Sequence, residues 1–198
     1  MKRVLLLLPR GFETLEAAAF ADVFGWDGVC GSKSTRLHSA AAAPRVETSF
    51  GHSVNAELLW TEVEVGDFDA LALPGGFARY GYYDICRDQA ALALLRDFTA
   101  AGKPLAAVCT AALVWAAAGI VSERRVAIYG GEQGRWLRQL ADAGALACDR
   151  RLCVDGRLIS GSAPSSAPYV ALKLLEMLTG ADNAAAIAAM TGYTEQRL

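Results

Sequence analysis

Short apolar runs alternate with longer segments of helical periodicity along most of the chain. The runs at 4–8, 70–73 (within FDALALPGG) and 104–109 are uninterrupted and apolar, which is typical of strands buried on both faces. This alternation predicts an α/β protein with a mostly parallel sheet and helices on both faces. Apolar residues at helical spacing predict helices over 13–26, 87–102, 110–120, 132–144 and 162–180, with a last alanine-rich helix from Asp182.

Smaller features fill the rest of the pattern. A strand near Leu37–Ala42 and a short ribbon near Val46–Val54 are expected among Gly, Ser and Pro residues, and a further strand over 124–131. Asp155 and Gly156 are a two-residue hairpin signal. Thr14 is available to cap the first helix, and Pro168 is tolerated in the first turn of a later one. No repeat or linker divides the chain, so one domain over 1–198 is expected.

Composition narrows the classes of partner. The chain has 198 residues, 54% of them hydrophobic, which is enough for a full core. Its formal net charge of −2 does not favour nucleic acid or an anionic membrane as a partner, and a small neutral partner fits at least as well. The apolar part of the N-terminal run MKRVLLLLPRG is too short for a secretory signal, and no run reaches the roughly 18 apolar residues of a membrane span. We therefore expect a cytoplasmic protein.

The cysteines agree with a reducing compartment. Five is an odd number, and the spacing matches neither a CxxC pair nor a Cys/His metal site, so no metal and no cofactor are expected. Cys148 and Cys153 could pair across the turn CDRRLC, but without an export signal free thiols are expected. The other cysteines are Cys30, Cys86 and Cys109.

Cys109 stands apart because of its position in AAVCTAAL, between an apolar strand and an alanine-rich helix. Such a seam requires a sharp turn with small neighbours, as in the nucleophile elbow of hydrolases. The N–H groups of the following helix would favour thiolate over thiol, so a depressed pKa is predicted for Cys109. The alternative is a cysteine that only packs in the core.

Two further features would complete a site at the carboxyl ends of the strands. Glu16 interrupts an apolar helix and would be protonated if burial and the neighbouring thiolate raise its pKa, whereas Glu13, three residues earlier, is interpreted as a charge serving the helix dipole. The amides of Gly75, Gly76 and Thr110 could form an oxyanion hole, although a glycine-rich turn alone would explain the pair.

These segments carry a family resemblance. LLLLPRGFETLE, FDALALPGG, GKPLAAVCTAALVWAAAGI and GRLISGSAPSSAPYVALKLLE follow the order and spacing of the ThiJ/PfpI superfamily, which includes the Parkinsonism-associated deglycase. The resemblance implies a flavodoxin-like three-layer α/β/α sandwich of the class I glutamine amidotransferase type, and a homodimer. It also implies that Cys109 is the nucleophile, that Glu16 is its carboxyl partner, and that Gly75, Gly76 and Thr110 surround the oxyanion.

The chain departs from that pattern where other members carry histidine. Thr110 and Tyr129 occupy those positions, and the two histidines, His38 and His52, lie before the LPGG segment. A Cys-His protease dyad is therefore not expected. The Cys-Thr pair resembles that of isonitrile hydratases, which carry Asp where this chain has Glu16. Tyr129 could replace the histidine as a donor or serve only as a strand-end aromatic residue.

Aromatic residues near this segment leave several roles open. Tyr80, Tyr82 and Tyr83, with Trp26 or Trp136, could line the pocket, form a dimer contact, or simply pack.

Two classes of function follow. The first is an enzyme whose Cys109 attacks a small electrophilic carbon with help from Glu16, in hydration, hydrolysis or lyase chemistry. The second is a non-catalytic sensor of oxidants or electrophiles in which Cys109 is oxidised to sulfinate beside the protonated Glu16. A chaperone-like interaction module with a vestigial site is a further reading. In the first two cases the partner is a small electrophile or oxidant.

Overall fold

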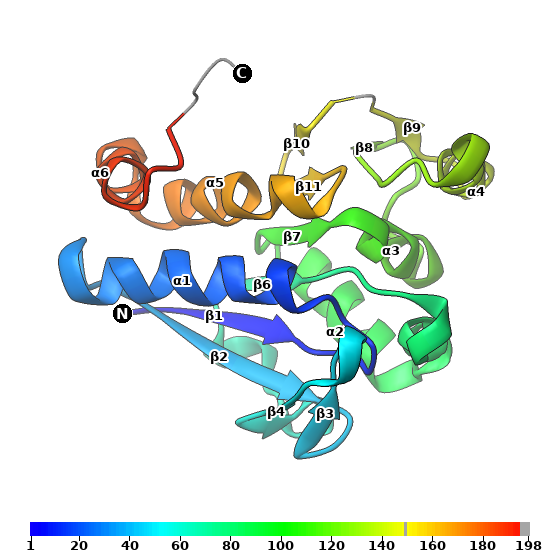
Figure 1. Ribbon diagram of the computed structural model, residues 1–198, viewed down its shortest axis with the longest axis horizontal. Coiled ribbons are helices and arrows are strands. Elements are labelled where there is room, and N and C mark those ends of the chain that lie inside the picture. The colour runs from blue at the N-terminus through cyan, green and yellow to red at the C-terminus, as the bar shows by residue number, and fades with distance from the viewer. Residues whose placement is uncertain (149, 195–198) are drawn as a thin grey trace.

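A seven-stranded sheet runs through the computed structural model, which describes residues 1–148 and 150–194 (Figure 1). The strand order is β10-β11-β7-β6-β1-β2-β5, and every neighbouring pair is parallel except β10 and β11. The strands are β1 (Lys2–Leu7), β2 (Thr35–Ala41), β5 (Leu58–Leu59), β6 (Ala70–Leu73), β7 (Leu105–Val108), β10 (Leu152–Asp155) and β11 (Leu158–Gly161).

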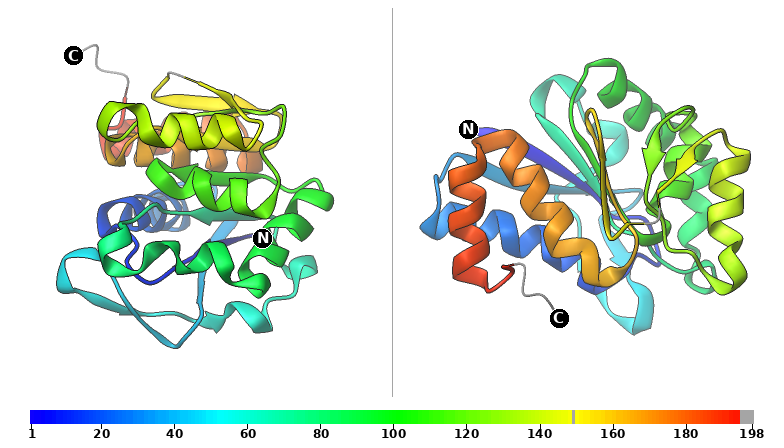
Figure 2. Two further views of the ribbon diagram at one scale, coloured as in Figure 1. Left: turned by 90° about the vertical axis from the view of Figure 1, so that its right-hand side faces the viewer. Right: turned by 90° about the horizontal axis from the view of Figure 1, so that it is seen from above.

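Helices cover both faces of this sheet. One face carries α1 (Thr14–Cys30), α5 (Ala167–Thr179) and α6 (Ala181–Thr191), and the other carries α2 (Gln89–Ala100) and α3 (Ala112–Ala118) (Figure 2). Because both faces are covered, β6 and β7 are buried along their whole length. The predicted α/β sandwich is confirmed. In the part of the chain that the structure describes, no helix is both long and apolar enough to cross a membrane.

Several local predictions are confirmed with small shifts. The ribbon consists of β3 (Arg45–Glu47) and β4 (Ser53–Asn55), which pair antiparallel. The β10–β11 hairpin closes through Gly156, at φ +59°, and Arg157, one residue later than the Asp-Gly signal suggests. Pro168 lies in the first turn of α5, where its missing N–H costs nothing.

Other local predictions are wrong. Thr14 does not cap α1: Glu13 precedes the helix without a side-chain cap bond, and Thr14 is the first helical residue. The strand expected over 124–131 is only β8 (Arg125–Val126), which pairs with β9 (Leu146–Ala147) in a separate two-stranded sheet beside α4 (Arg135–Asp142). It cannot join the main sheet, because β10 folds back along the free edge of β11 through the tight hairpin and occupies it.

The topology places a crevice at the carboxyl ends of β1 and β6. From β1 the chain crosses over α1 to β2, whereas from β6 it crosses over α2 to β7 on the opposite side. Neighbouring strands whose connections diverge leave room for a ligand beyond their carboxyl ends. The loops after β1 and β6 join there: Glu13 N–H donates to Gly75 O at 2.8 Å, and Phe12 forms an isolated bridge with Gly76.

The far end of α1 is anchored by Asp27, which is completely buried. Its Oδ2 accepts the Thr35 hydroxyl at 2.5 Å, tying the helix to β2. Its Oδ1 accepts the Ser32 N–H at 2.9 Å and the Asn183 amide at 2.8 Å, which adds α6 to the cluster. One carboxylate therefore holds together three elements on the face of the sheet that carries Glu16.

Replacing Asp27 by Ala should destabilise the protein by about 2–4 kcal/mol, because buried donors lose a charged acceptor. Urea unfolding at neutral pH measures this loss as a lower midpoint. Asp22→Ala, at an exposed position of the same helix, is the matched control and should stay within about 0.5 kcal/mol of wild type. Equal midpoints for the two variants would contradict the anchoring role.

Candidate active site

Cys109 lies at the turn between β7 and α3 with its backbone in the left-handed region. Its φ is +58°, a conformation that is unusual for a residue with a side chain, and its exposed fraction is 7%. The turn approaches the loop after β6 so closely that a Cβ added to Gly75 would lie 2.9 Å from both Thr110 N and Val108 O. The close approach of the Cys109 turn therefore requires glycine at position 75. The strained backbone of Cys109 itself is typical of a functional site.

Glu16 projects from the first turn of α1 into this crevice and is completely buried. Its Oε2 accepts the Gly75 N–H at 2.6 Å. Its Oε1 is buried without a hydrogen bond of ordinary geometry to any described residue. Burial, followed by the charge of Glu13, raises the pKa of Glu16 to about 8. The direction of this pKa shift agrees with the expected protonated carboxyl. The charge that raises the pKa is that of Glu13, however, since Cys109 acts in the opposite direction through a hydrogen bond.

Glu13 is a member of the site that the sequence reasoning missed. It is half-buried at the start of α1, burial raises its pKa, and it shares a hydrogen bond with the Glu16 side chain, which lowers it. A protonated Glu16 can donate to Glu13 as well as to sulfur. The three-residue spacing placed both carboxyls on one helix face, but the helix dipole explained Glu13 equally well before the loop after β6 was known to bury that face.

The thiol itself corrects a prediction. Burial raises the pKa of Cys109, the nearby Glu16 carboxylate raises it further, and the Thr110 N–H lowers it only in part. The depressed pKa expected from the helix N-terminus is therefore wrong, because desolvation and a like charge outweigh one turn of N–H groups. The thiol and the Glu16 carboxyl form a coupled pair in which ionising either group disfavours ionising the other.

The amides expected to form an oxyanion hole already have partners in this structure. Gly75 N–H holds Glu16, and Gly76 N–H donates to Thr110 Oγ1 at 3.2 Å, whose hydroxyl in turn donates to Gly76 O at 3.0 Å. The Thr110 N–H faces the sulfur. Gly75 thus positions Glu16, Gly76 is engaged with the Thr110 side chain, and of these three amides it is that of Thr110 that faces the sulfur.

Tyr129 and the two histidines of the chain are poorly placed to exchange a proton with Cys109. Tyr129 donates its backbone N–H to Cys109 O at 3.2 Å, but its side chain is 46% exposed and has no hydrogen bond to a described residue. His38 is in β2 and pairs with Glu57 at 2.8 Å, and His52 is exposed in the ribbon. Neither histidine hydrogen-bonds to Cys109 or Glu16 within 1–148 and 150–194.

The aromatic residues divide into three roles. Tyr82 is buried and donates to Pro74 O at 2.6 Å, which supports the turn before Gly75. Tyr80 packs against Phe50 and Phe77. Tyr83 and Trp136, with ring centroids 5.6 Å apart, line a cavity of about 530 Å³. Trp26 lies on α1, 41% exposed.

All five cysteines are free, including Cys148 and Cys153. Across the described residues, no three His, Cys, Asp or Glu side chains gather as the ligands of a metal ion would.

Comparison with known proteins identifies a matching family. The model of the DJ-1/PfpI family matches residues 2–177. An uncharacterised protein of Archaeoglobus fulgidus is 30% identical over 89% of this chain and 98% of its own, and a deglycase of Thermococcus kodakarensis is 28% identical over 82% and 90%. The solved structure of oxidised DJ-1 from Toxoplasma gondii superposes with a TM-score of 0.82 at 28% identity, covering 96% of this chain and 98% of that one.

The raised pKa of Glu16 predicts a specific dependence of stability on pH. Between the ordinary value of 4.5 and about 8, the folded protein keeps a proton that the unfolded chain has lost, so stability falls as pH rises. Glu16→Gln removes this proton and should gain stability relative to wild type between pH 5 and 8, by at most about 1.4 kcal/mol per pH unit.

Urea unfolding at several pH values measures the difference. Glu123→Gln, at an exposed position, is the control and should follow wild type. If the difference in the free energy of unfolding between wild type and Glu16→Gln stayed constant with pH, Glu16 would have an ordinary pKa.

Proposed function

The chain belongs to the DJ-1/PfpI family, and we propose that it is an enzyme whose Cys109 attacks a small electrophilic carbon while Glu16 transfers the proton. The observation that carries the proposal is the buried Glu16 carboxyl, held by Gly75 N–H and coupled to the Cys109 thiol. A carboxyl with a pKa of about 8 can both donate and accept a proton near neutral pH, as general acid–base catalysis requires.

The first step balances within the site. A sulfur–carbon bond forms and a π bond of the electrophilic carbon breaks. The Cys109 proton passes to one oxygen of Glu16, while the proton on its other oxygen passes to the heteroatom, or the carbanionic carbon, of the substrate. The negative charge that develops is stabilised by the Thr110 N–H, and by Gly76 N–H once it leaves its long bond to Thr110 Oγ1. Hydration, hydrolysis and lyase reactions share this step and differ in whether water or a leaving group follows.

The choice among these reactions is narrowed by what surrounds the thiol. A Cys-His protease dyad is disfavoured, because no imidazole hydrogen-bonds to Cys109 within the described residues. The deglycases among the relatives make removal of a carbonyl-derived adduct one activity to test.

We also propose a cytoplasmic location, which the five free thiols support.

A second function is supported by the same contacts. A protonated Glu16 next to sulfur could hold a sulfinate by a hydrogen bond, and a related structure is that of an oxidised DJ-1 protein. In that case Cys109 senses peroxide and has no turnover.

The two functions separate in one experiment. Purified protein is assayed for turnover of aldehydes, isonitriles and amides, and separately treated with peroxide and analysed by mass spectrometry. For the enzyme, turnover should vanish in Cys109→Ser and fall about 10²- to 10⁴-fold in Glu16→Gln, because the amide keeps the shape but cannot transfer a proton. Glu123→Gln is the control.

An absence of turnover with every substrate class would reject the enzyme. The sensor would be retained if peroxide then adds two oxygen atoms to Cys109 and Glu16→Leu prevents their accumulation.

We propose further that the protein is a homodimer, with the exposed face of α1 as the contact. Leu15, Trp26 and Val29 are exposed there at 58%, 41% and 70%. Together with Gly25, they form an apolar stripe along one side of the helix, broken by Asp22.

Light scattering at micromolar concentration should return about twice the chain mass of 20.9 kDa. Gly25→Glu should shift the protein toward monomer without loss of folding, because a side chain at 25 meets nothing within 4 Å in the monomer. Ala100→Glu, on an exposed position of α2, should leave the dimer intact. A wild-type mass of one chain would reject a stable dimer.

A further inference from the structure

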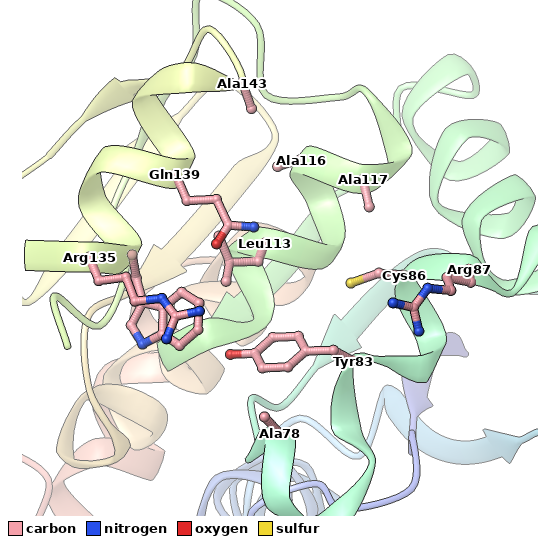
Figure 3. Close-up of a pocket in the computed structure, with 11 residues that line it drawn as sticks. Ala78, Tyr83, Cys86, Arg87, Leu113, Ala116, Ala117, Arg135, Gln139 and Ala143 are labelled. Carbon is pink, nitrogen blue, oxygen red and sulfur yellow. The ribbon is translucent and has the colours of Figure 1, made fainter. Parts of the chain in front are cut away.

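A cavity of about 530 Å³ opens beside the Cys109 turn, between α3, α4 and the 3₁₀ segment η5 (Tyr82–Arg87) (Figure 3). Its apolar wall comes from Leu113, Ala116 and Ala117 of α3, whose short side chains leave the space unfilled. A volume of this size accommodates a small organic molecule.

The cavity adjoins the reactive site through the chain segments that build both. Ala78 at its edge is two residues past Gly76, and Leu113 lies one helical turn beyond Cys109. Burial raises the pKa of Tyr83, but the side chain of Thr110, the residue that follows Cys109, lies close enough to lower it. A ligand here would therefore extend toward the thiol along the Tyr83 ring.

Among the residues of the lining that the structure describes, two are arginines and none is acidic. Arg135 and Arg87 both line the cavity, and neither forms an ion pair with a described side chain. The Arg135 guanidinium stacks on Trp136, 4.5 Å from the ring centroid, so its position is held by the indole. Figure 3 shows the Tyr83 hydroxyl pointing toward Arg135, with the Gln139 amide on the same side.

This arrangement separates two kinds of contact. Arg135, Gln139 and Tyr83 offer hydrogen-bond donors at one end, suited to the oxygens of a carboxylate. The rings of Tyr83 and Trp136, tilted by 41°, offer a flat apolar surface beside those donors. Arg87, at the other end of the Tyr83 ring, adds positive potential without contacting the same group.

We infer that this cavity binds the anionic part of the substrate, a carboxylate carried on a flat conjugated or aromatic body. The carboxylate faces Arg135, and the flat body lies against Tyr83 and Trp136. The statement that this molecule also carries the reacting carbon rests on the proposed function. The binding of the anion in the cavity does not depend on it.

Calorimetry with benzoate and benzamide tests the binding directly, because the two probes share size and shape and differ in charge. Benzoate should bind wild type and Cys109→Ser equally, and about tenfold more tightly than benzamide. Arg135→Gln should weaken benzoate binding about five- to tenfold, a modest loss because the guanidinium is exposed, and leave benzamide unchanged. Trp136→Leu should weaken both probes.

Arg138→Gln, one turn along the same helix and outside the cavity lining, is the matched control and should bind benzoate as wild type does. Equal affinity for the two probes, or an equal loss in the Arg135 and Arg138 variants, would overturn the inference, since the effect would then be general surface charge.

Turnover of 4-carboxybenzaldehyde against benzaldehyde distinguishes the two proposals. Arg135-dependent binding of benzoate without turnover of either aldehyde would retain the anion site and count against the enzyme. Turnover of benzaldehyde, with no advantage for its carboxylate form and no benzoate binding, would retain the enzyme and reject the anion site.

Discussion

The hydrogen bond from Gly75 N–H to the buried carboxyl of Glu16 is the contact on which the candidate site depends. It joins the helix after β1 to the loop after β6 at the point where the crossover connections diverge. The same glycine lies against the turn at Cys109, so closely that no side chain fits. Three strand ends are thereby brought close to one another, and a buried carboxyl is held next to a buried thiol.

Electrostatics in that space follow from desolvation. Two carboxyls and a thiol lie together, and the free energy needed to ionise each group is increased by burial and by the charge of its neighbours. Glu16 and Cys109 therefore keep their protons to a higher pH than an exposed carboxyl or thiol does. This cost in stability is typical of sites in which a group must donate and accept a proton near neutral pH. The Asp27 cluster at the other end of α1 is the opposite case, since each oxygen of that buried carboxylate has a donor and the cluster stabilises the helix.

The reactive turn and the neighbouring cavity have complementary chemistry. Two carboxyls lie near the Cys109 thiol, whereas the cavity is bordered by two arginines and two aromatic rings. Tyr83 links the two, through its reach to Thr110 on one side and its ring packed on Trp136 on the other. An elongated substrate with an electrophilic carbon and a distant anionic group would satisfy both regions.

The pattern of apolar and small residues was sufficient to predict the strands, the helices and the turn at Cys109, because these depend mainly on residues close together in the chain. The uninterrupted apolar runs of β6 and β7 and the helical spacing in α2 and α5 specify a covered parallel sheet, and a small-residue seam at Cys109 specifies a sharp turn. Within that frame, Glu16 and Gly75 could be selected because the carboxyl ends of parallel strands meet at one edge.

Only the tertiary structure decided what those residues do. Whether Gly75 serves as an oxyanion donor or holds Glu16, whether Glu13 is a surface charge or a member of the site, and whether the pKa of Cys109 falls or rises all depend on burial and on neighbours distant in sequence. The short β8 strand and the cavity between η5 and α4 have the same origin, since they arise from packing between elements rather than from any one segment. The periodicity of apolar residues indicates which face of a helix or strand is buried. The desolvation and the electrostatic environment of a side chain on that face depend on which residues pack against it.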